Sequence, residues 1–332
     1  MSPMCMYSAT DGMAGDFHFV HYVSRAQGGV GLIIAEATGV EPEGRITRGC
    51  LGLWTDVQKA PLKRIVDYIH QHTDTKIGIQ LNHSGRKGST LSGKEVAPED
   101  GGWITKGPSA IPFQPADRIP EVLTVDEIRR IVKSFGAAAR RAIDAGFDLV
   151  EIHAAHGYLL HQFLSPVSNQ RKDEYGGSFE NRIRFLVEVV EEVVAAIGND
   201  KPLFVRISGT EYAPDGGWDL EQSVKLAGIL KTHGVDLMDV SSGGNIYDAK
   251  INPYNAYQLP LAAEIKEKTG IMTGTVGMIE EAAMAEEILQ SGKADLILAG
   301  RALLRNPYLP VHAAFEAGEP CFFPVQYERG KP

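Results

Sequence analysis

The sequence predicts a (β/α)8 TIM barrel, in which each of eight parallel strands is followed by a helix. Short apolar segments rich in β-forming residues alternate with amphipathic helical segments along the 332 residues. Polar clusters follow several of these strands, at the barrel edge that carries active sites. We expect strands at residues 2–4, 30–36, 76–82, 147–153, 202–208, 236–241, 271–273 and 295–299.

An open, doubly wound sheet is the alternative arrangement, because the number of strands does not distinguish an open sheet from a closed one. No G-x-G-x-x-G motif opens a helix after the first strand, which weakens this alternative. Right-handed crossovers between parallel strands favour closure into a barrel. We therefore expect residues 1–332 to form a single barrel domain.

Helical spacing and cap residues define the helices between these strands. Thr124 with Glu127, and Asp219 with Gln222, have the spacing of capping boxes at helix starts. Glycines are expected just past helix ends at Gly146, Gly234 and Gly270. The predicted helices cover residues 17–28, 56–72, 125–145, 179–197, 220–233, 259–268, 280–290 and 303–317.

Three long connections should lie on the C-terminal face of the barrel. Residues 84–123 form the longest, rich in glycine, proline and charge, after the third strand. Loops of that length inside a compact domain are usually functional. The other two are residues 165–177 and 209–218. We expect all three to surround the active site.

Composition narrows the class of protein. A net charge of −9 without a basic stripe argues against nucleic acid as a partner. No apolar run approaches the roughly 18 residues of a membrane-spanning helix, and the first residues lack the pattern of a secretion signal. The three cysteines, Cys5, Cys50 and Cys321, are widely separated and suggest neither a disulfide framework nor a metal cluster. These features indicate a cytoplasmic protein.

The segment 151–158 (EIHAAHGY) carries the strongest chemical signal. It places His153, His156 and Tyr158 where a buried strand meets a helix. Two histidines three residues apart beside a tyrosine could bind a metal, stabilise an oxyanion, or only satisfy a polar strand end. The residues alone leave these three interpretations open.

Two further groups suggest a bound anion and a planar polar ring. Gly277, Gly300 and Arg301 follow the last two strands, where barrels of this type bind phosphate. Tight turns and a surface ion pair are the alternative explanation of these residues. Gln80 and Arg206 lie within predicted strands, and a carboxamide with a guanidinium suits an imide ring that becomes anionic on reduction.

A buried arginine needs a negatively charged partner, since an unpaired buried charge is very costly. Arg206 could therefore instead form a structural ion pair with Glu151 or Asp239. The sequence does not choose between a structural pair and a ligand for this arginine.

Five segments together resemble the Old Yellow Enzyme family, specifically its thermophilic-like branch, which includes bacterial xenobiotic reductases. They are residues 2–7 (SPMCMY), 80–87 (QLNHSGRK), 151–158 (EIHAAHGY), 173–178 (DEYGGS) and 326–330 (QYERG). The resemblance runs in order from residue 1 to residue 330. It implies a barrel with tightly bound, non-covalent FMN that reduces activated C=C bonds of enone-type small molecules with NADPH.

The resemblance also assigns roles to individual residues of this chain. His153 and His156 would hold the substrate's carbonyl oxygen, Tyr158 would donate a proton, and Tyr7 would line the pocket. Arg329 would reach the active site of a neighbouring subunit, which implies a homodimer or homotetramer with the tail 319–332 at the interface. The implied FMN contacts are Ser2, Pro3, Met4, Cys5, Ala37, Gln80, Arg206, Gly277, Gly300 and Arg301, and no metal site is implied.

One departure from the family pattern concerns the start of the chain. Relatives carry about twenty residues ahead of the flavin contacts, including a hairpin that covers the bottom of the barrel. The present sequence begins at the contacts, so we expect that hairpin to be missing. A missing hairpin would affect the stability of the barrel more than its chemistry.

Three other functions compete with the flavin enzyme. A zinc hydrolase could use His153 and His156 with His161 or His83, although no carboxylate completes a convincing site. A Schiff-base aldolase would need a lysine at a strand end, where none is predicted. A non-catalytic flavin-binding barrel would leave the histidines and Tyr158 without a use.

Overall fold

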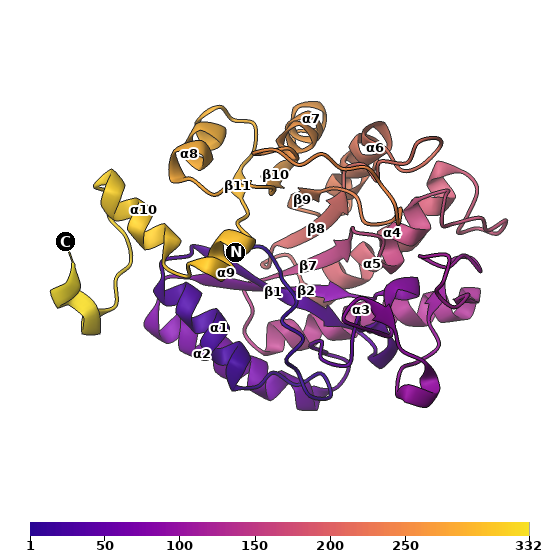
Figure 1. Ribbon diagram of the computed structural model, residues 1–332, viewed down its shortest axis with the longest axis horizontal. Coiled ribbons are helices and arrows are strands. Elements are labelled where there is room, and N and C mark those ends of the chain that lie inside the picture. The colour runs from indigo at the N-terminus through magenta and orange to yellow at the C-terminus, as the bar shows by residue number, and fades with distance from the viewer. Residues whose placement is uncertain (332) are drawn as a thin grey trace.

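The computed structural model describes residues 1–331 and contains a curved parallel sheet at its centre (Figure 1). Its seven strands follow one another in the order β1-β2-β7-β8-β9-β10-β11. Each neighbouring pair is parallel. The strands are β1 Leu32–Gly39, β2 Lys76–Asn82, β7 Leu149–Ala154, β8 Leu203–Ser208, β9 Leu237–Ser241, β10 Met272–Thr275 and β11 Leu296–Ile297.

Residues Met1 and Ser2 occupy the eighth position, between β1 and the chain that follows β11. The Met1 nitrogen donates to Leu32 O at 2.6 Å, and Ile34 N donates to Met1 O at 3.1 Å. On the other side, Ser2 N donates to Ala299 O at 2.9 Å. These bonds close the ring, so the barrel prediction is confirmed and the open sheet is excluded.

The predicted strand at residues 2–4 is wrong in detail, because those residues have no strand assignment. Pro3 has no backbone N–H to continue the ladder. After Ser2 the chain leaves the sheet, and Met6 N donates to the Glu36 carboxylate at 2.9 Å. The segment thus leads directly from the barrel wall to the barrel mouth.

Helices surround the sheet, with α1 and α2 on one side and α6, α7 and α8 on the other (Figure 1). All eight predicted helical regions contain helix. Their bounds are α1 Asp16–Gln27, α2 Lys59–His72, α3 Val125–Asp144, α5 Phe179–Ile197, α6 Leu220–Thr232, α7 Leu259–Thr269, α8 Ala282–Gln290, α9 Arg301–Arg305 and α10 Leu309–Ala317, with the short α4 Leu159–Leu164 inside the site region.

The predicted helix over residues 303–317 is in fact two helices, α9 and α10. Pro307 lies between them and disfavours helical backbone at the preceding residue. Asn306 accordingly adopts an extended conformation (φ −138°, ψ 99°). The break lets α9 begin at Arg301, directly beside the barrel mouth.

Of the two predicted capping boxes, one is complete and the other is only partly formed. Thr124 and Glu127 form the complete capping box, in which each side chain accepts a hydrogen bond from the backbone N–H of the other residue. Asp219 accepts from Gln222 N at 2.9 Å, but the Gln222 amide donates to Gly217 O instead of returning to the cap. Only half of the second box is therefore formed.

Side chains inside the barrel form layers, because alternate residues of each strand point inward. At the N-terminal end the inward residues are apolar and form one buried cluster: Ile34, Leu149, Phe204, Leu237 and Leu298. A cavity of about 340 Å³ adjoins this cluster and is lined by Met1 and Leu32 among others. Two residues further along the strands, the inward positions are polar.

The long connection over residues 84–123 contains two small strand pairs. The hairpin of β3 Thr90–Leu91 and β4 Lys94–Glu95 is antiparallel, and β5 Lys106–Gly107 pairs with β6 Glu121–Val122 in parallel. Single 3-10 turns at η3 Gly85–Lys87 and η4 Pro98–Asp100 bend the chain between them. Within the described part of the chain, every helix is too short or too polar to cross a membrane.

Candidate active site

The polar layer of the barrel interior is built from facing residues of neighbouring strands. Gln80 on β2 is in register with Glu151 on β7, and Arg206 on β8 with Asp239 on β9. Gln80 Nε2 donates to Glu151 Oε1 at 2.8 Å, and Arg206 Nε lies 3.1 Å from Asp239 Oδ2. All four side chains are buried. Asp239 is thus the ion-pair partner of Arg206 that the sequence left undecided.

Glu151 and Asp239 are two buried carboxyl groups whose charges oppose each other. Both are fully buried, and Glu151 Oε2 has no N–H or O–H donor among the described residues. Burial raises the pKa of both carboxyl groups, and the neighbouring Asp239 charge raises the pKa of Glu151 further. These effects favour the protonated form of Glu151 and leave the Asp239 carboxylate to balance Arg206.

The orientation of Gln80 follows from this arrangement. Its amide nitrogen is taken by Glu151, so its oxygen is the atom left for another donor. Such an oxygen suits the imide N–H of a flavin ring. Arg206 uses Nε for Asp239, which leaves its two terminal nitrogens for a further acceptor.

His153, His156 and Tyr158 come together as the sequence predicted. The His153 ring lies 5.2 Å from that of His156 and 5.0 Å from that of Tyr158, in edge-to-face contacts. The strand β7 ends at Ala154, and His156 then adopts a left-handed conformation (φ +57°) that turns the chain towards α4. This turn brings the three rings to one side of the barrel mouth.

Hydrogen bonds set the proton positions on the two histidines. His153 Nδ1 accepts from Ala155 N at 3.3 Å, so the neutral ring carries its proton on Nε2. His156 Nε2 lies 2.7 Å from Ser241 Oγ. Burial lowers the pKa of both histidines well below its usual value, so both rings are neutral at pH 7. His153 is therefore a fixed neutral donor.

The proton on His156 depends on Ser241. That hydroxyl has one proton and lies near both His156 and Gln258 Oε1, the latter at 3.1 Å. Gln258 Oε1 already receives the Ser242 hydroxyl at 2.6 Å. Ser241 Oγ itself donates to Gln258 Oε1, so it can accept from His156 Nε2–H, and these contacts do not make His156 Nδ1 a second donor.

Tyr158 is a phenol that keeps its proton. Burial raises its pKa well above the ordinary value. The ring borders a cavity of about 550 Å³ that Tyr7, Ile46 and Phe113 also line. A proton donor that stays neutral at the edge of a cavity has the properties of a general acid.

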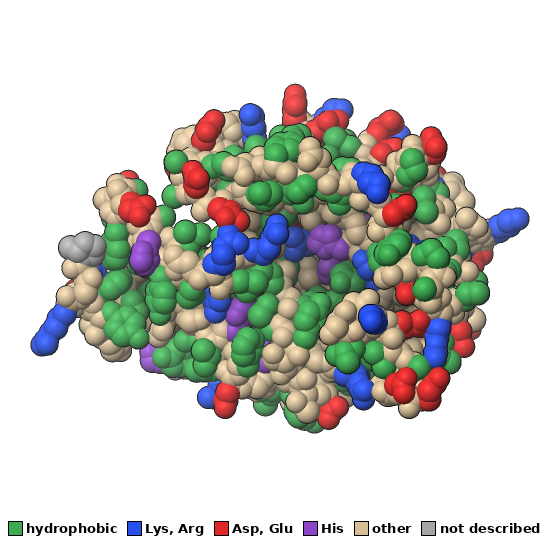
Figure 2. All heavy atoms as spheres, in the orientation of Figure 1, with side chains coloured by type: hydrophobic (Ala, Val, Ile, Leu, Met, Phe, Trp, Pro, Cys, Tyr) green, Lys and Arg blue, Asp and Glu red, His purple; other side chains and the backbone are tan. Residues whose placement is uncertain are grey.

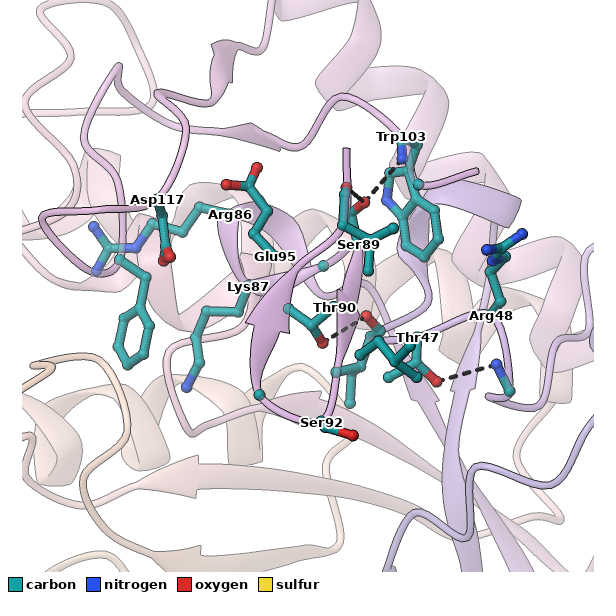
Figure 3. Close-up of a pocket in the computed structure, with 18 of the residues that line it drawn as sticks. Thr47, Arg48, Arg86, Lys87, Ser89, Thr90, Ser92, Glu95, Trp103 and Asp117 are labelled. Atoms are coloured by element: carbon teal, nitrogen blue, oxygen red, sulfur yellow. Dashed lines mark hydrogen bonds between the residues drawn. The ribbon is translucent and has the colours of Figure 1, made fainter. Parts of the chain in front are cut away.

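Lys87 is a site residue that sequence reasoning missed. Its Nζ donates to His156 O at 2.8 Å and Gly244 O at 2.7 Å, and lies 4.2 Å from the centre of the Phe113 ring. Burial lowers its pKa to about 7. Figure 3 shows Lys87 and Arg86 on the side of the cavity opposite Trp103 and Arg48. The position of Lys87 soon after β2 was the available signal.

The segment after Ser2 is held against the mouth by a second buried carboxyl. Glu36 on β1 accepts from Met6 N at 2.9 Å and from the Tyr22 hydroxyl at 3.1 Å. Burial raises the pKa of Glu36 to about 7. The Cys5 thiol lies against the backbone of Ala37, so two of the predicted flavin contacts are neighbours.

The residues predicted to bind phosphate line one cavity of about 190 Å³, with Arg206 beside Gly277, Gly300 and Arg301. Gly277 has φ +121°, and an added Cβ would lie 2.8 Å from the Tyr257 ring, so only glycine fits. Met4 lies 3.6 Å from the Cβ position of Gly300. Figure 2 shows basic and histidine side chains gathered around a hollow in the middle of this face.

Arg329 is the predicted site residue that the structure does not bring to this mouth. It lies in the 3-10 segment η5 Val325–Gly330, is exposed, and does not line the 550 Å³ cavity. The C-terminal end extends beyond α10, away from the strands (Figure 1).

The donor set fits FMN. Gln80 offers an oxygen and Arg206 two terminal nitrogens. The 190 Å³ cavity offers glycine backbone and Arg301, which has no ion-pair partner within residues 1–331. The one carboxylate lining that cavity, Glu280, is paired with Arg305. The fold and these groups define a flavin-binding barrel of the oxidoreductase class.

Comparisons with known proteins also indicate a flavin-dependent oxidoreductase. The family model of the NADH:flavin oxidoreductase / NADH oxidase family matches residues 1–317. An NADPH dehydrogenase of Listeria innocua is 50% identical over 331 residues, which is 99% of this chain and 93% of the relative. That of Bacillus subtilis is 48% identical over 332 residues, with 99% and 94% coverage.

Solved structures show the same fold. Morphinone reductase has a TM-score of 0.79 at 29% identity, over 97% of this chain and 86% of that one. An old yellow enzyme homologue from Zymomonas mobilis has a TM-score of 0.77 at 29% identity, with 97% and 89% coverage.

The chain belongs to the NADH:flavin oxidoreductase / NADH oxidase family, and its resemblance to the Old Yellow Enzymes is confirmed. It is an FMN enzyme with NADPH as reductant. The hydrolase, the aldolase and the non-catalytic barrel are thereby set aside.

Proposed function

We propose that the enzyme reduces the activated C=C bond of α,β-unsaturated carbonyl compounds, in two half-reactions that share one site. The observation that carries this proposal is the neutral donor His153 beside the protonated phenol of Tyr158, which borders the 550 Å³ cavity. Bound FMN supplies the hydride that NADPH provides, delivered to the β-carbon of the substrate. The residues of the chain bind the substrate, polarise it and supply the proton.

His153 Nε2 would donate to the substrate's carbonyl oxygen, and His156 would hold the same oxygen beside it. Negative charge grows on this oxygen as hydride adds to the β-carbon, so fixed neutral donors stabilise the transition state more than the ground state. Tyr158 would then protonate the α-carbon. Tyr7 would line the pocket beside these groups, where it is half-exposed.

The flavin contacts follow from the same arrangement. Ser2, Pro3, Met4, Cys5 and Ala37 would lie against the ring, since the first five residues run from the barrel wall to its mouth. Gln80 and Arg206 would bind the pyrimidine portion. The phosphate would lie in the 190 Å³ cavity on Gly277, Gly300 and Arg301.

The substitution Tyr158→Phe tests this assignment. Flavin reduction by NADPH needs no proton from Tyr158, so it should proceed at nearly the wild-type rate. Reoxidation by an enone should slow by about 10²–10⁴, the usual contribution of general acid catalysis. Rapid-mixing spectroscopy of the flavin absorbance measures the two half-reactions separately.

The control is Tyr7→Phe, which removes a phenol from the same cavity. It should slow reoxidation less than Tyr158→Phe does. Wild-type reoxidation in Tyr158→Phe, with an unchanged solvent isotope effect, would show that another group supplies the proton.

We also propose that Arg329 acts in the site of a neighbouring copy, in a homodimer or homotetramer. Its exposure and its absence from the lining of the 550 Å³ cavity of its own chain support this. Sedimentation velocity of the FMN-loaded enzyme should show no monomer. Arg329→Ala should then change the KM for the enone without releasing FMN, and an active monomer would contradict the proposal.

A further inference from the structure

Cys5 and Cys50 are far apart in the sequence but lie together at the barrel mouth. Cys50 is 1% exposed, in a small buried cluster with Ala37 and Ile46. Cys5 and Tyr158 pack against the same cluster. We call Cys5 and Cys50 the thiol pair.

Backbone contacts hold the two segments of the thiol pair against each other. Ala9 N donates to Gly49 O at 2.8 Å. A Cβ on Gly49 would lie 2.4 Å from Tyr7 O, so the backbone at residue 7 rests directly on the residue before Cys50. Tyr7 itself has a left-handed backbone (φ +51°), which only a closely constrained segment retains.

The two sulfur atoms have different chemical environments. Cys50 Sγ accepts from Thr47 N at 3.3 Å and lies 3.7 Å from Thr47 Oγ1. A hydrogen bond from the Cys5 thiol, with those from Thr47, lowers the pKa of Cys50 to about 6 despite burial. The same interaction, with burial, raises the pKa of Cys5. Cys50 is thus the sulfur of the pair that ionises more readily, and Cys5 the one that keeps its proton.

We propose that the thiol pair is a redox modification site, in which a hydroperoxide converts Cys5 and Cys50 into a reversible disulfide. The Cys50 sulfur forms an S–O bond as the peroxide O–O bond breaks, which gives a sulfenic acid and releases hydroxide or alkoxide. The Cys5 sulfur then forms the S–S bond as the S–O bond breaks, and water leaves. The pair loses two electrons, and the peroxide gains them.

The cavity beside Tyr158 provides the route to this site. Its lining includes Ile46, Thr47 and Gly49, which precede Cys50, and Tyr7, which follows Cys5. Cys5 itself is half-buried. The turn from Thr47 to Cys50 therefore connects the wall of the cavity to the Cys50 sulfur.

The disulfide would also control catalysis, a consequence that rests on the proposed contact of Cys5 with the flavin. Linking the sulfurs would draw Cys5 towards Cys50 and move the segment that carries Tyr7. Displacement of a site group by about 1 Å can cost about 10²-fold in rate. We expect oxidation to slow enone-driven reoxidation by up to about that factor, and dithiothreitol to restore it.

The test uses FMN-loaded enzyme that is first reduced with dithiothreitol, desalted and then exposed to hydrogen peroxide. Free thiols are blocked with iodoacetamide before digestion with trypsin. Cys5 lies in the peptide that ends at Arg25, and Cys50 in the peptide of residues 49–59. The proposal predicts a linked species of these two peptides that separates on reduction. Unlinked peptides, or Cys50 found as sulfinic acid, would overturn it.

Two variants complete the experiment, each compared with its own reduced state. Cys50→Ser should form no linked peptide and lose no activity to peroxide. Cys321→Ser, which removes the half-buried cysteine of the tail, should behave like the wild type. Peroxide inactivation of Cys50→Ser as fast as wild type would refute the proposed control.

The same data separate this inference from the proposed function. A linked peptide in an enzyme that still reoxidises at the wild-type rate would confirm the modification site and count against the placement of Cys5 at the flavin. Tyr158→Phe, whose thiol pair is intact, should form the linked peptide as readily as the wild type.

Discussion

The two ends of the proposed flavin site are built in contrasting ways. Around β7, β8 and β9, the functional groups are side chains on fully buried strand residues, held by hydrogen bonds to other side chains. Around β10 and β11, they are glycine backbone and an exposed arginine, after strands of four and two residues. We call these the side-chain region and the backbone region.

The contrast reflects the chemistry each region performs. Proton and hydride transfer need groups with defined protonation states and fixed orientations. Burial and hydrogen bonds between side chains provide both. Anion binding needs N–H groups and positive charge, which loops can supply. Substitutions in the side-chain region should therefore reduce stability or activity more than substitutions in the backbone region.

The largest effect should come from Asp239→Asn, which removes the carboxylate that balances Arg206. Breaking a buried ion pair on one side typically costs about 3–5 kcal/mol. Chemical denaturation of the FMN-loaded enzyme measures this loss.

Glu151→Gln is the matched control for Asp239→Asn. Glutamine reproduces a protonated glutamic acid, since it can accept from Gln80 and donate to Asp239, so the free energy of unfolding should change by less than about 1 kcal/mol. An equal loss in both variants would show that Glu151 is ionised.

Next in size should be His153→Ala, which deletes an oxyanion donor. Such a loss costs about 10²–10³ in rate, or about 3–4 kcal/mol. The loss should appear in enone-driven reoxidation and leave reduction by NADPH nearly intact. Ser241→Ala, which removes a hydroxyl that contacts His156 and Gln258 but not His153, should cost less than His153→Ala does. Equal losses in both half-reactions would point to a structural role for His153.

The smallest effect should come from Arg301→Ala in the backbone region. A charged hydrogen bond contributes about 1.5–3 kcal/mol, and an exposed one falls towards the lower value. FMN should bind about tenfold more weakly, as measured by fluorescence of the released flavin. Lys268→Ala, which removes an exposed cation at the end of α7 that is paired with Glu264, is the control and should retain FMN. Unchanged FMN affinity in Arg301→Ala would place the phosphate elsewhere.

Periodic and local features of the sequence were sufficient to predict the barrel. The strand over residues 76–82 and the helix over 179–197 match the structure residue for residue, because long amphipathic and apolar patterns determine such elements directly. The Thr124 cap also formed as expected, since its partner is three residues away. The sequence did not predict the break at Pro307, because helical spacing continues on both sides of the proline.

By itself the sequence determined which strand ends carry chemistry: His153, His156 and Tyr158 share one motif, and Gly300 and Arg301 are neighbours. Only the tertiary structure decided the partners. Asp239 rather than Glu151 pairs with Arg206, and Cys50 reaches Cys5, because these contacts join segments distant in sequence. Protonation states were decided in the same way, since a pKa depends on burial and on charges that several strands bring together.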